Sequence, residues 1–304
     1  VFGGHSHVGT MIYLGDNWPD RYRDHLFTHN LHGHQLNHQI NRREAGGFDT
    51  IHAGEDLLFV GDPQYVGVQV QYGPDGAVYL SDWYDPRHCH SPNAEQWDRS
   101  NGRIYRMRYV PTWKPTAVDW EAAGDAELIE AQQHRNEWHG RTARRVLAER
   151  AARGTLDATT LDRLRALALD DPQPTRRLRG IWTLIGCRAI DAELLARAIV
   201  DSDEQVRGWA VRAAVEAYEQ GVDRDRIAAL LIGTAERDDS LLVRRALAGA
   251  AQFVDPPTSW ALLERLVGQA ENEQDRDLPS MIWFALAQRA ADDHADDLVV
   301  GKLA

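Results

Sequence analysis

GPDGAVYLSDWYDPRHCHSPNAEQWDRSNGRIYR, residues 73–106, contains the clearest turn and strand signals in the chain. Pro74 and Gly76 predict a turn, because proline fixes φ for the second turn position and glycine supplies the freedom needed at its end. Residues 77–83 then predict a short strand, and residues 103–109 alternate as a second one. A long polar loop separates them. This order of strand, polar loop and strand is typical of a β-propeller blade.

The same pattern occurs twice. Residues 26–40 contain a strand, a turn at Gly33 and a second strand, and they match residues 78–109 with an offset of 52 residues at the first strand. A repeat of this size made of short strands indicates a propeller. Residues 1–112 amount to about two blades, whereas a closed propeller needs at least four. The sequence therefore predicts the C-terminal blades of a β-propeller, with the preceding blades outside this sequence.

The composition changes beyond about residue 120, where Ala, Leu, Arg, Asp and Glu dominate. Segments starting at Leu178, Val206 and Val243 each follow an acidic turn, with offsets of 28 and 37 residues. Acidic residues favour helix N-termini, and apolar residues three and four apart bury one helix face against the next repeat. We expect an α-solenoid of HEAT-like repeats over residues 141–304.

Residues 113–140 are expected to form a linker and a first helix. Trp113 and Trp120 lie in this linker, and a bare linker rarely carries two tryptophans. We expect both rings to be buried between the two domains. The predicted fold class is therefore β then α.

Charge and hydropathy exclude some classes of function. The net charge of −12 argues against a general nucleic-acid binder, because phosphate binding depends on Lys and Arg. No apolar run reaches 18 residues, so we expect no membrane span. The two cysteines, Cys89 and Cys187, match no zinc or haem spacing, and we expect two free thiols.

The densest group of chemically capable side chains is Asp82, Asp85, His88, Cys89 and His90. Histidine and cysteine suit a transition metal, and carboxylates suit calcium. The alternative is that the two aspartates cap the loop while the cysteine packs. We retain a metal site at Asp82, Asp85, His88 and His90 as a hypothesis.

Several segments together carry a resemblance to a known family. They are MIYLGDNWPDRYR at residues 11–23, NLHGHQLN at 30–37, GPDGAVYLSDWYD at 73–85, HCH at 88–90 and NGRIYR at 101–106. Over roughly residues 5–145 the chain resembles the membrane-bound dehydrogenase or haem-binding CxxCH protein family of planctomycetes and their relatives. That family has a propeller similar to those of quinoprotein glucose and sorbosone dehydrogenases, then HEAT repeats, and often a c-type cytochrome domain.

The resemblance implies a function and cofactors. It implies part of a quinone- or haem-linked dehydrogenase acting on sugars or alcohols, with the propeller carrying the site and the HEAT repeats serving as a scaffold. Pyrroloquinoline quinone (PQQ) and Ca²⁺ are the implied cofactors, and haem c is implied only if a CxxCH segment lies downstream. The implied location is periplasmic or otherwise extracytoplasmic. We expect no dehydrogenase activity from this part alone.

The resemblance also suggests a catalytic base. Quinoprotein sugar dehydrogenases present a histidine from a loop similar to that of His5 and His7, and an imidazole with a pKa near 6.5 suits removal of a hydroxyl proton. A structural role for these histidines is the alternative. We further expect His88 or His90 to lie within about 10 Å of this loop, at one end of the sheets.

A second function remains open, because a fold does not establish an activity. The chain is alternatively a non-catalytic propeller and HEAT module that binds glycans or, on its HEAT surface, a protein partner.

Overall fold

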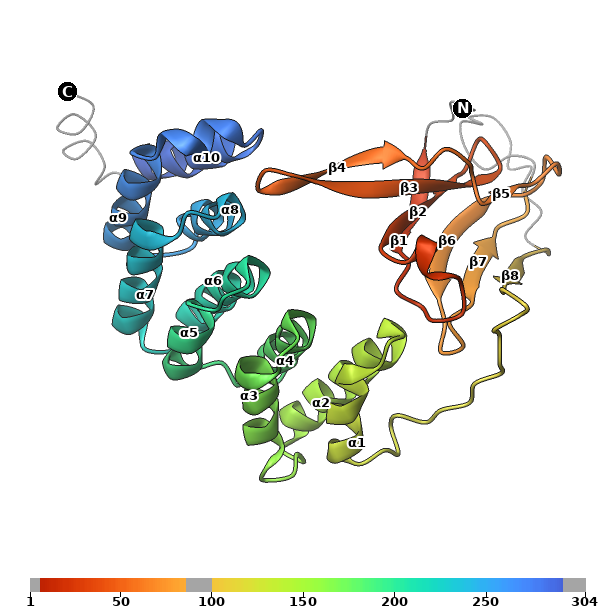
Figure 1. Cartoon of the computed structure of the whole chain (residues 1–304), viewed down its shortest axis with the longest axis horizontal. Coiled ribbons are helices and arrows are strands. Elements are labelled where there is room, and N and C mark those ends of the chain that lie inside the picture. The colour runs from red at the N-terminus through yellow and green to blue at the C-terminus, as the bar shows by residue number, and fades with distance from the viewer. Residues whose placement is uncertain (1–5, 86–99, 292–304) are drawn as a thin grey trace. The chain divides into compact units, whose positions relative to one another are not determined.

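The computed structural model describes residues 6–85 and 100–291, and Figure 1 shows the order of the elements. The chain divides into two compact units, which we call the sheet unit and the helical unit. The sheet unit contains Val1–Arg42, Asp49–Ala123 and Gln133–Thr142. The helical unit contains Arg43–Phe48, Gly124–Gln132 and Ala143–Ala304. The predicted order, β then α, is confirmed. The expected boundaries of residues 1–112, 113–140 and 141–304 stay predictions.

Two antiparallel sheets make up the β region. The first sheet has the order β1-β2-β3-β4, with β5 also paired to β3. Its strands are β1 (His7–Ile12), β2 (His25–Asn30), β3 (Gln35–Glu44), β4 (Gly47–His52) and β5 (Leu58–Phe59). The second sheet has the order β6-β7-β8, with β6 (Gly67–Tyr72), β7 (Val78–Asp82) and β8 (Arg103–Met107).

The propeller prediction is wrong. In the described residues the strands form two open sheets, and neither closes into the ring of blades that the prediction required. The hairpins themselves form where the sequence placed them, with β2 against β3 and β7 against β8. Turn residues and alternating side chains specify such hairpins locally, but they do not specify how sheets are arranged in space. The repeat of about 52 residues reflects the recurrence of hairpins and not a propeller.

An aromatic cluster forms the core of the sheet unit. Tyr13 and Phe27 are completely buried and stack with their ring centroids 5.8 Å apart. The Tyr13 hydroxyl donates to the carbonyl of Gly76 at 2.7 Å and accepts the backbone N–H of Trp18 at 2.8 Å. Gly76 has φ +68°, and a Cβ there would lie 2.5 Å from the Asn17 nitrogen. The turn therefore requires glycine, and it is held against the segment that follows Tyr13.

Ten α-helices occur in the described residues. They are α1 (Asp125–Glu130), α2 (Glu137–Arg153), α3 (Thr160–Asp170), α4 (Pro174–Gly186), α5 (Ala192–Ala198), α6 (Glu204–Glu219), α7 (Arg224–Arg237), α8 (Leu241–Ala250), α9 (Pro256–Val267) and α10 (Leu278–Ala290). The helices predicted after the acidic turns are confirmed. From α3 onward, each helix packs against the helix two places along the chain, so that α4, α6, α8 and α10 form one row and α3, α5, α7 and α9 a second.

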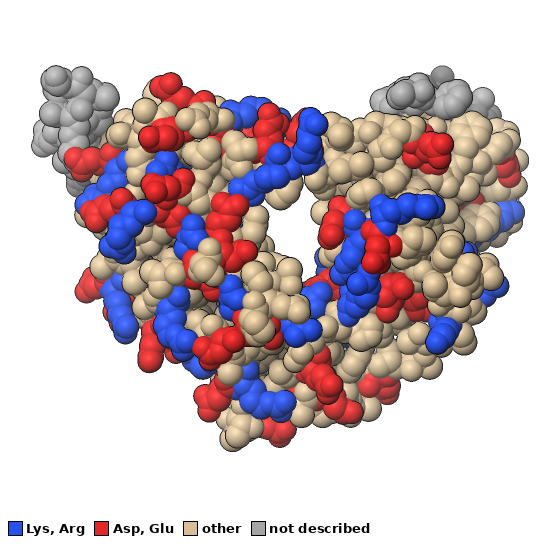
Figure 2. Space-filling model, viewed as in Figure 1, with Lys and Arg blue, Asp and Glu red and all other residues tan. Residues whose placement is uncertain are grey.

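Side-chain caps explain where four of these helices begin. Asp191, Asp203, Ser240 and Asp255 stand at N-caps, and each side chain accepts a backbone N–H of the first turn. Figure 2 shows acidic and basic side chains intermixed over the helical elements. Assignment of this unit to HEAT repeats stays a prediction.

No helix among the described residues is both long and apolar enough to cross a bilayer.

The two linker tryptophans are half-buried and both belong to the sheet unit. The Trp113 indole N–H donates to Asp75 at 2.8 Å, and that of Trp120 donates to Nδ1 of His139 at 3.2 Å. Their predicted place between the two domains stays a prediction.

Candidate functional site

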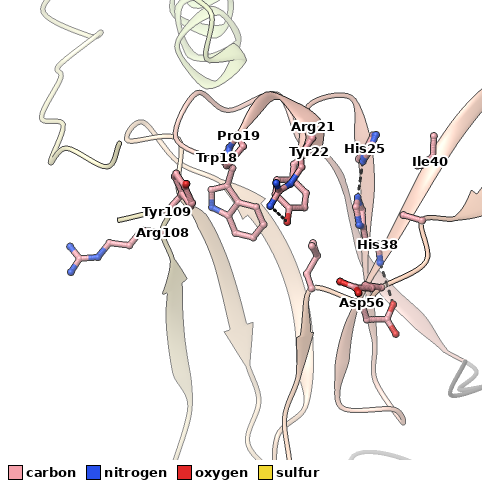
Figure 3. Close-up of a pocket in the computed structure, with 13 residues that line it drawn as sticks. Trp18, Pro19, Arg21, Tyr22, His25, His38, Ile40, Asp56, Arg108 and Tyr109 are labelled. Atoms are coloured by element: carbon pink, nitrogen blue, oxygen red, sulfur yellow. Dashed lines mark hydrogen bonds between the residues drawn. The ribbon is translucent and has the colours of Figure 1, made fainter. Parts of the chain in front are cut away.

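The sheet unit contains a pocket of about 680 Å³ that combines aromatic, imidazole and carboxylate groups. It is lined by Trp18, Pro19, Arg21, Tyr22, His25, His38, Ile40, Ala53, Glu55, Asp56, Leu57, Arg108 and Tyr109. We call it the Trp18 pocket. Figure 3 shows Trp18 and Tyr22 beside each other, and His25 above His38.

Two aromatic rings form one wall of the Trp18 pocket. The Trp18 indole N–H donates to the carbonyl of Met107 at 3.2 Å, which fixes the orientation of the ring. Tyr22 belongs to a single 3₁₀ turn, Asp20–Tyr22, which follows Pro19. The two rings meet edge to face with centroids 5.3 Å apart. The wall is therefore rigid and offers apolar ring surface to a ligand.

A pair of histidines stands next to this wall. His25 begins β2 and His38 lies in β3, and Nδ1 of His25 is 2.7 Å from Nε2 of His38. One ring must donate and the other accept, so the bond requires at least one neutral imidazole. Burial lowers the pKa of His38, and the neighbouring His25 lowers it further. The pair is therefore expected to hold a neutral, proton-accepting imidazole near pH 7.

Asp56 supplies a fixed carboxylate. Its Oδ1 accepts the Asn37 side-chain N–H at 2.9 Å and lies 3.1 Å from Nε2 of His52. Partial burial opposes its charged form, but these hydrogen bonds outweigh burial and lower the pKa of Asp56. A charged carboxylate is thus held beside the histidine pair at neutral pH.

Two arginines lie at the rim of the pocket. An Arg21 Nη donates to the Tyr22 hydroxyl at 3.2 Å, and the Arg108 guanidinium lies 4.3 Å from the ring centroid of Trp113. Both side chains are exposed. The pocket therefore combines apolar ring faces with donors and acceptors of both charge signs. In the part of the chain that the structure describes, no group of three His, Cys, Asp or Glu side chains could hold a metal ion.

The residues expected to be functional lie elsewhere. His7 is exposed at the start of β1, whereas Asp82 and Asp85 are buried at and after the end of β7. The Asp82 Oδ1 accepts the backbone N–H groups of Val66 and Tyr84, both at 2.8 Å, as an aspartate that caps the loop would. None of these three lines the Trp18 pocket.

His5, His88, Cys89 and His90 lie outside the described residues, so the predicted base, metal site and 10 Å separation stay predictions.

The described residues do place two of the predicted positions at one end of the sheets. Asp82 pairs with Gly67, the first residue of β6. A Cβ at Gly9, near the start of β1, would lie 2.2 Å from the backbone oxygen of Val68. The start of β1 and the end of β7 are therefore close. His25, by contrast, lies at the opposite end of β2 from the residue paired with His7.

Sequence reasoning missed the residues of the Trp18 pocket. His25 and His38 are 13 positions apart, and only the β2–β3 register brings them together, since Phe27 pairs with His38 and His25 with Ile40. A signal was available in the alternation of His25 and Phe27 on one face of a strand, which would direct His25 toward the same side as a core aromatic residue.

The comparisons with known proteins cover part of the chain. Residues 5–111 match the profile of a family described as a domain of unknown function, DUF7133. This match spans less than half of the 304 residues. Neither the curated proteins nor the solved structures give a significant match. The resemblance to the CxxCH dehydrogenase family stays a prediction.

Proposed function

We propose that the sheet unit binds a sugar or a similar small polyhydroxylated molecule in the Trp18 pocket. The observation that carries the proposal is a rigid aromatic wall, Trp18 and Tyr22, beside a hydrogen-bonding group made of His25, His38 and Asp56. A sugar ring has apolar C–H faces that pack on aromatic rings, while its hydroxyl groups donate to and accept from polar side chains. Fixed polar groups lose little freedom on binding, which favours affinity.

Binding should be measured by isothermal titration calorimetry with the full chain and a panel of mono- and disaccharides. We expect one or more sugars to bind, and Tyr22→Ala and His25→Ala each to weaken binding about tenfold, the cost of one lost stacking or hydrogen-bonding contact. Phe59→Ala is the matched control, because Phe59 is 62% exposed and outside the pocket. Failure of every sugar to bind at millimolar concentration, or unchanged affinity in both pocket variants, would refute the proposal.

A second candidate function is oxidation of the bound alcohol group. The neutral imidazole of the His25–His38 pair favours it, because such a ring can accept the hydroxyl proton of a bound alcohol. A quinone, if one were bound beside the pocket, would supply the acceptor for the hydride from the same carbon. The alcohol would become a carbonyl. The test is reduction of an artificial electron acceptor by the chain with added PQQ, Ca²⁺ and the sugars that bind. Turnover by the chain alone would overturn the sequence-based expectation that this part has no dehydrogenase activity. Binding without reduction would leave the sheet unit as a binding module.

A further inference from the structure

The outer edge of β8 differs from the edge of its counterpart in the other sheet. β3 is the third strand of the first sheet, and β5 and β4 pair with its outer edge. β8 is the third strand of the second sheet, and no described strand pairs with its outer edge. A free edge presents backbone N–H and C=O groups that can pair with another chain.

The ladder register shows which backbone groups face outward. The Trp83 N–H, just after β7, bonds toward the β6 side. Because antiparallel strands alternate, the backbone of Asp82 faces β8, where its partner is Arg103. The backbone N–H and C=O groups of Tyr105 and Met107 therefore also face β7. The N–H and C=O groups of Ile104 and Arg106 face away from the sheet.

The side chains on this edge are apolar and basic. Ile104 is 79% exposed, which is unusual for a large aliphatic residue. Arginines stand at 103, 106 and 108, and Arg106 pairs with Asp75 at 3.6 Å. The guanidinium of Arg103 lies over the Tyr84 ring, and those of Arg106 and Arg108 lie over Trp113. Charged side chains on a free edge disfavour pairing with a strand of like charge, so this edge favours an acidic one.

The end of the strand is held in position. The side chain of Asn17 donates to the Tyr109 carbonyl at 3.0 Å and accepts the Tyr109 N–H at 2.8 Å. A strand fixed in this way is ready to pair, and little freedom is lost when it does so.

We propose that β8 binds an extended acidic segment of another protein as a fourth, antiparallel strand. Backbone pairing to Ile104 and Arg106 would supply affinity, and acidic side chains beside the arginines would supply preference. A second copy of this chain is the less suitable occupant, because two β8 edges would bring arginines together. Arg108 also lines the Trp18 pocket, but the backbone pairing at Ile104 and Arg106 involves no residue of that pocket.

The probe is a peptide of about eight residues with alternating valine and glutamate, a typical strand length. Its control has lysine in place of glutamate. We expect the full chain to bind the glutamate peptide at least about tenfold more tightly, with the preference falling as salt is raised. Equal binding of the two peptides would overturn the proposal.

Ile104→Pro tests the backbone pairing, because proline removes an outward N–H without removing a bond to β7. We expect it to weaken binding at least about tenfold, and Ile104→Ala, which keeps the N–H, to weaken it less. Circular dichroism would verify that both variants fold. Undiminished binding by folded Ile104→Pro would refute the proposal.

Hydrogen exchange of the unmodified chain gives a measurement that needs no variant. The amides of Ile104 and Arg106 should gain protection when the peptide is added, whereas that of Tyr105 should already be protected. No gain at these two amides would contradict the proposal. A dimer that forms without peptide and is lost in Ile104→Pro would show that a second copy is the occupant.

Discussion

The sheet unit and the helical unit bury different kinds of side chain. His29, Asn30 and Gln35 are almost completely buried in the sheet unit, and each has a side-chain atom without a hydrogen-bond partner in the described residues. The helical interior is made largely of leucine, alanine, valine and isoleucine, with residues such as Leu195 and Leu231 fully buried. An unsatisfied buried polar group costs about 1–3 kcal/mol, so the sheet unit carries a cost that the helical interior largely avoids.

This difference indicates where each unit derives its stability. The helical unit depends on repeated apolar burial, with polar groups placed at helix ends and in arginine–aspartate pairs. The sheet unit depends on one aromatic cluster and retains polar groups around it. Buried polar groups without a hydrogen-bond partner are expected in regions where a protein binds or reacts. Those of His29, Asn30 and Gln35 lie in the same unit as the Trp18 pocket.

The largest expected effect concerns the apolar interior. Leu231→Ala, in the middle of α7, should reduce the free energy of unfolding by about 2–5 kcal/mol, because it removes buried methyl groups and leaves a cavity. Val200→Ala is the control, since Val200 is 66% exposed and should cost less than about 0.5 kcal/mol. Urea denaturation measures both. Equal costs would mean that α7 does not pack as described.

Acid should affect the two units in different pH ranges. Burial lowers the pKa of His29 from 6.5 to about 4, so the folded sheet unit disfavours the charged imidazole. The unfolded chain binds a proton at this histidine near pH 6.5, whereas the folded chain binds it only near pH 4. The free energy of unfolding is therefore highest above pH 6.5 and decreases as the pH falls toward 4. At about 1.4 kcal/mol per pH unit, the loss is about 3 kcal/mol. Hydrogen exchange measured by mass spectrometry should show the strands losing protection over this range.

The helical unit should respond at lower pH. Burial opposes the charged forms of Asp191 and Asp255. Hydrogen bonds outweigh this effect and lower both pKa values below 3.8. Asp191 accepts from Arg165, Asp255 accepts from Tyr218, and both accept from backbone N–H groups. Their stabilisation is present above the ordinary pKa and is lost only as the pH falls below it. His29→Gln should remove much of the loss between pH 6.5 and 4 in the strands alone. Loss of protection by helices and strands over the same range would contradict this difference.

The sequence predicted the helical unit well, and the reason is local. An acidic or hydroxyl cap such as Asp203 or Ser240 and the apolar spacing that follows are both read within one turn or two. The hairpins were predicted for the same reason. The propeller prediction failed, because closure depends on how sheets pack together, and no residue between 73 and 106 determines that.

The Trp18 pocket was not predicted. Loop composition directed attention to Asp82 and Asp85 at the end of β7, where the metal site stays a prediction. The Trp18 pocket depends on contacts between distant positions, such as the Trp18 indole with the Met107 carbonyl. Such contacts follow from strand register and sheet packing, which a single sequence specifies only weakly.

A smaller effect is expected from the ion pairs between helices. Nε and Nη2 of Arg207 donate to the two oxygens of Asp238 at 2.6 and 3.1 Å, and both side chains are largely buried. Arg207→Ala should cost about 2 kcal/mol, because the aspartate loses a charged partner. Arg207→Lys should recover less than half, since lysine cannot bond to both oxygens in this way. Arg197, whose pair with Asp170 is exposed on both sides, is the control, and Arg197→Ala should cost less than about 0.5 kcal/mol.

The smallest expected effect distinguishes N-cap side chains that accept a backbone hydrogen bond from those that do not. The Asp203 carboxylate accepts the backbone N–H groups of Gln205 and Val206 at 2.9 and 3.3 Å, so Asp203→Ala should cost about 1 kcal/mol. Gln173 holds the same position at α4, but its side chain makes no capping bond. Gln173→Ala should therefore change the free energy of unfolding by less than about 0.5 kcal/mol. Thermal and urea denaturation of the two variants would check the difference. If both cost the same, the cap bond of Asp203 would contribute nothing measurable, and the start of α6 would be set by its apolar contacts with α4 and α8 alone.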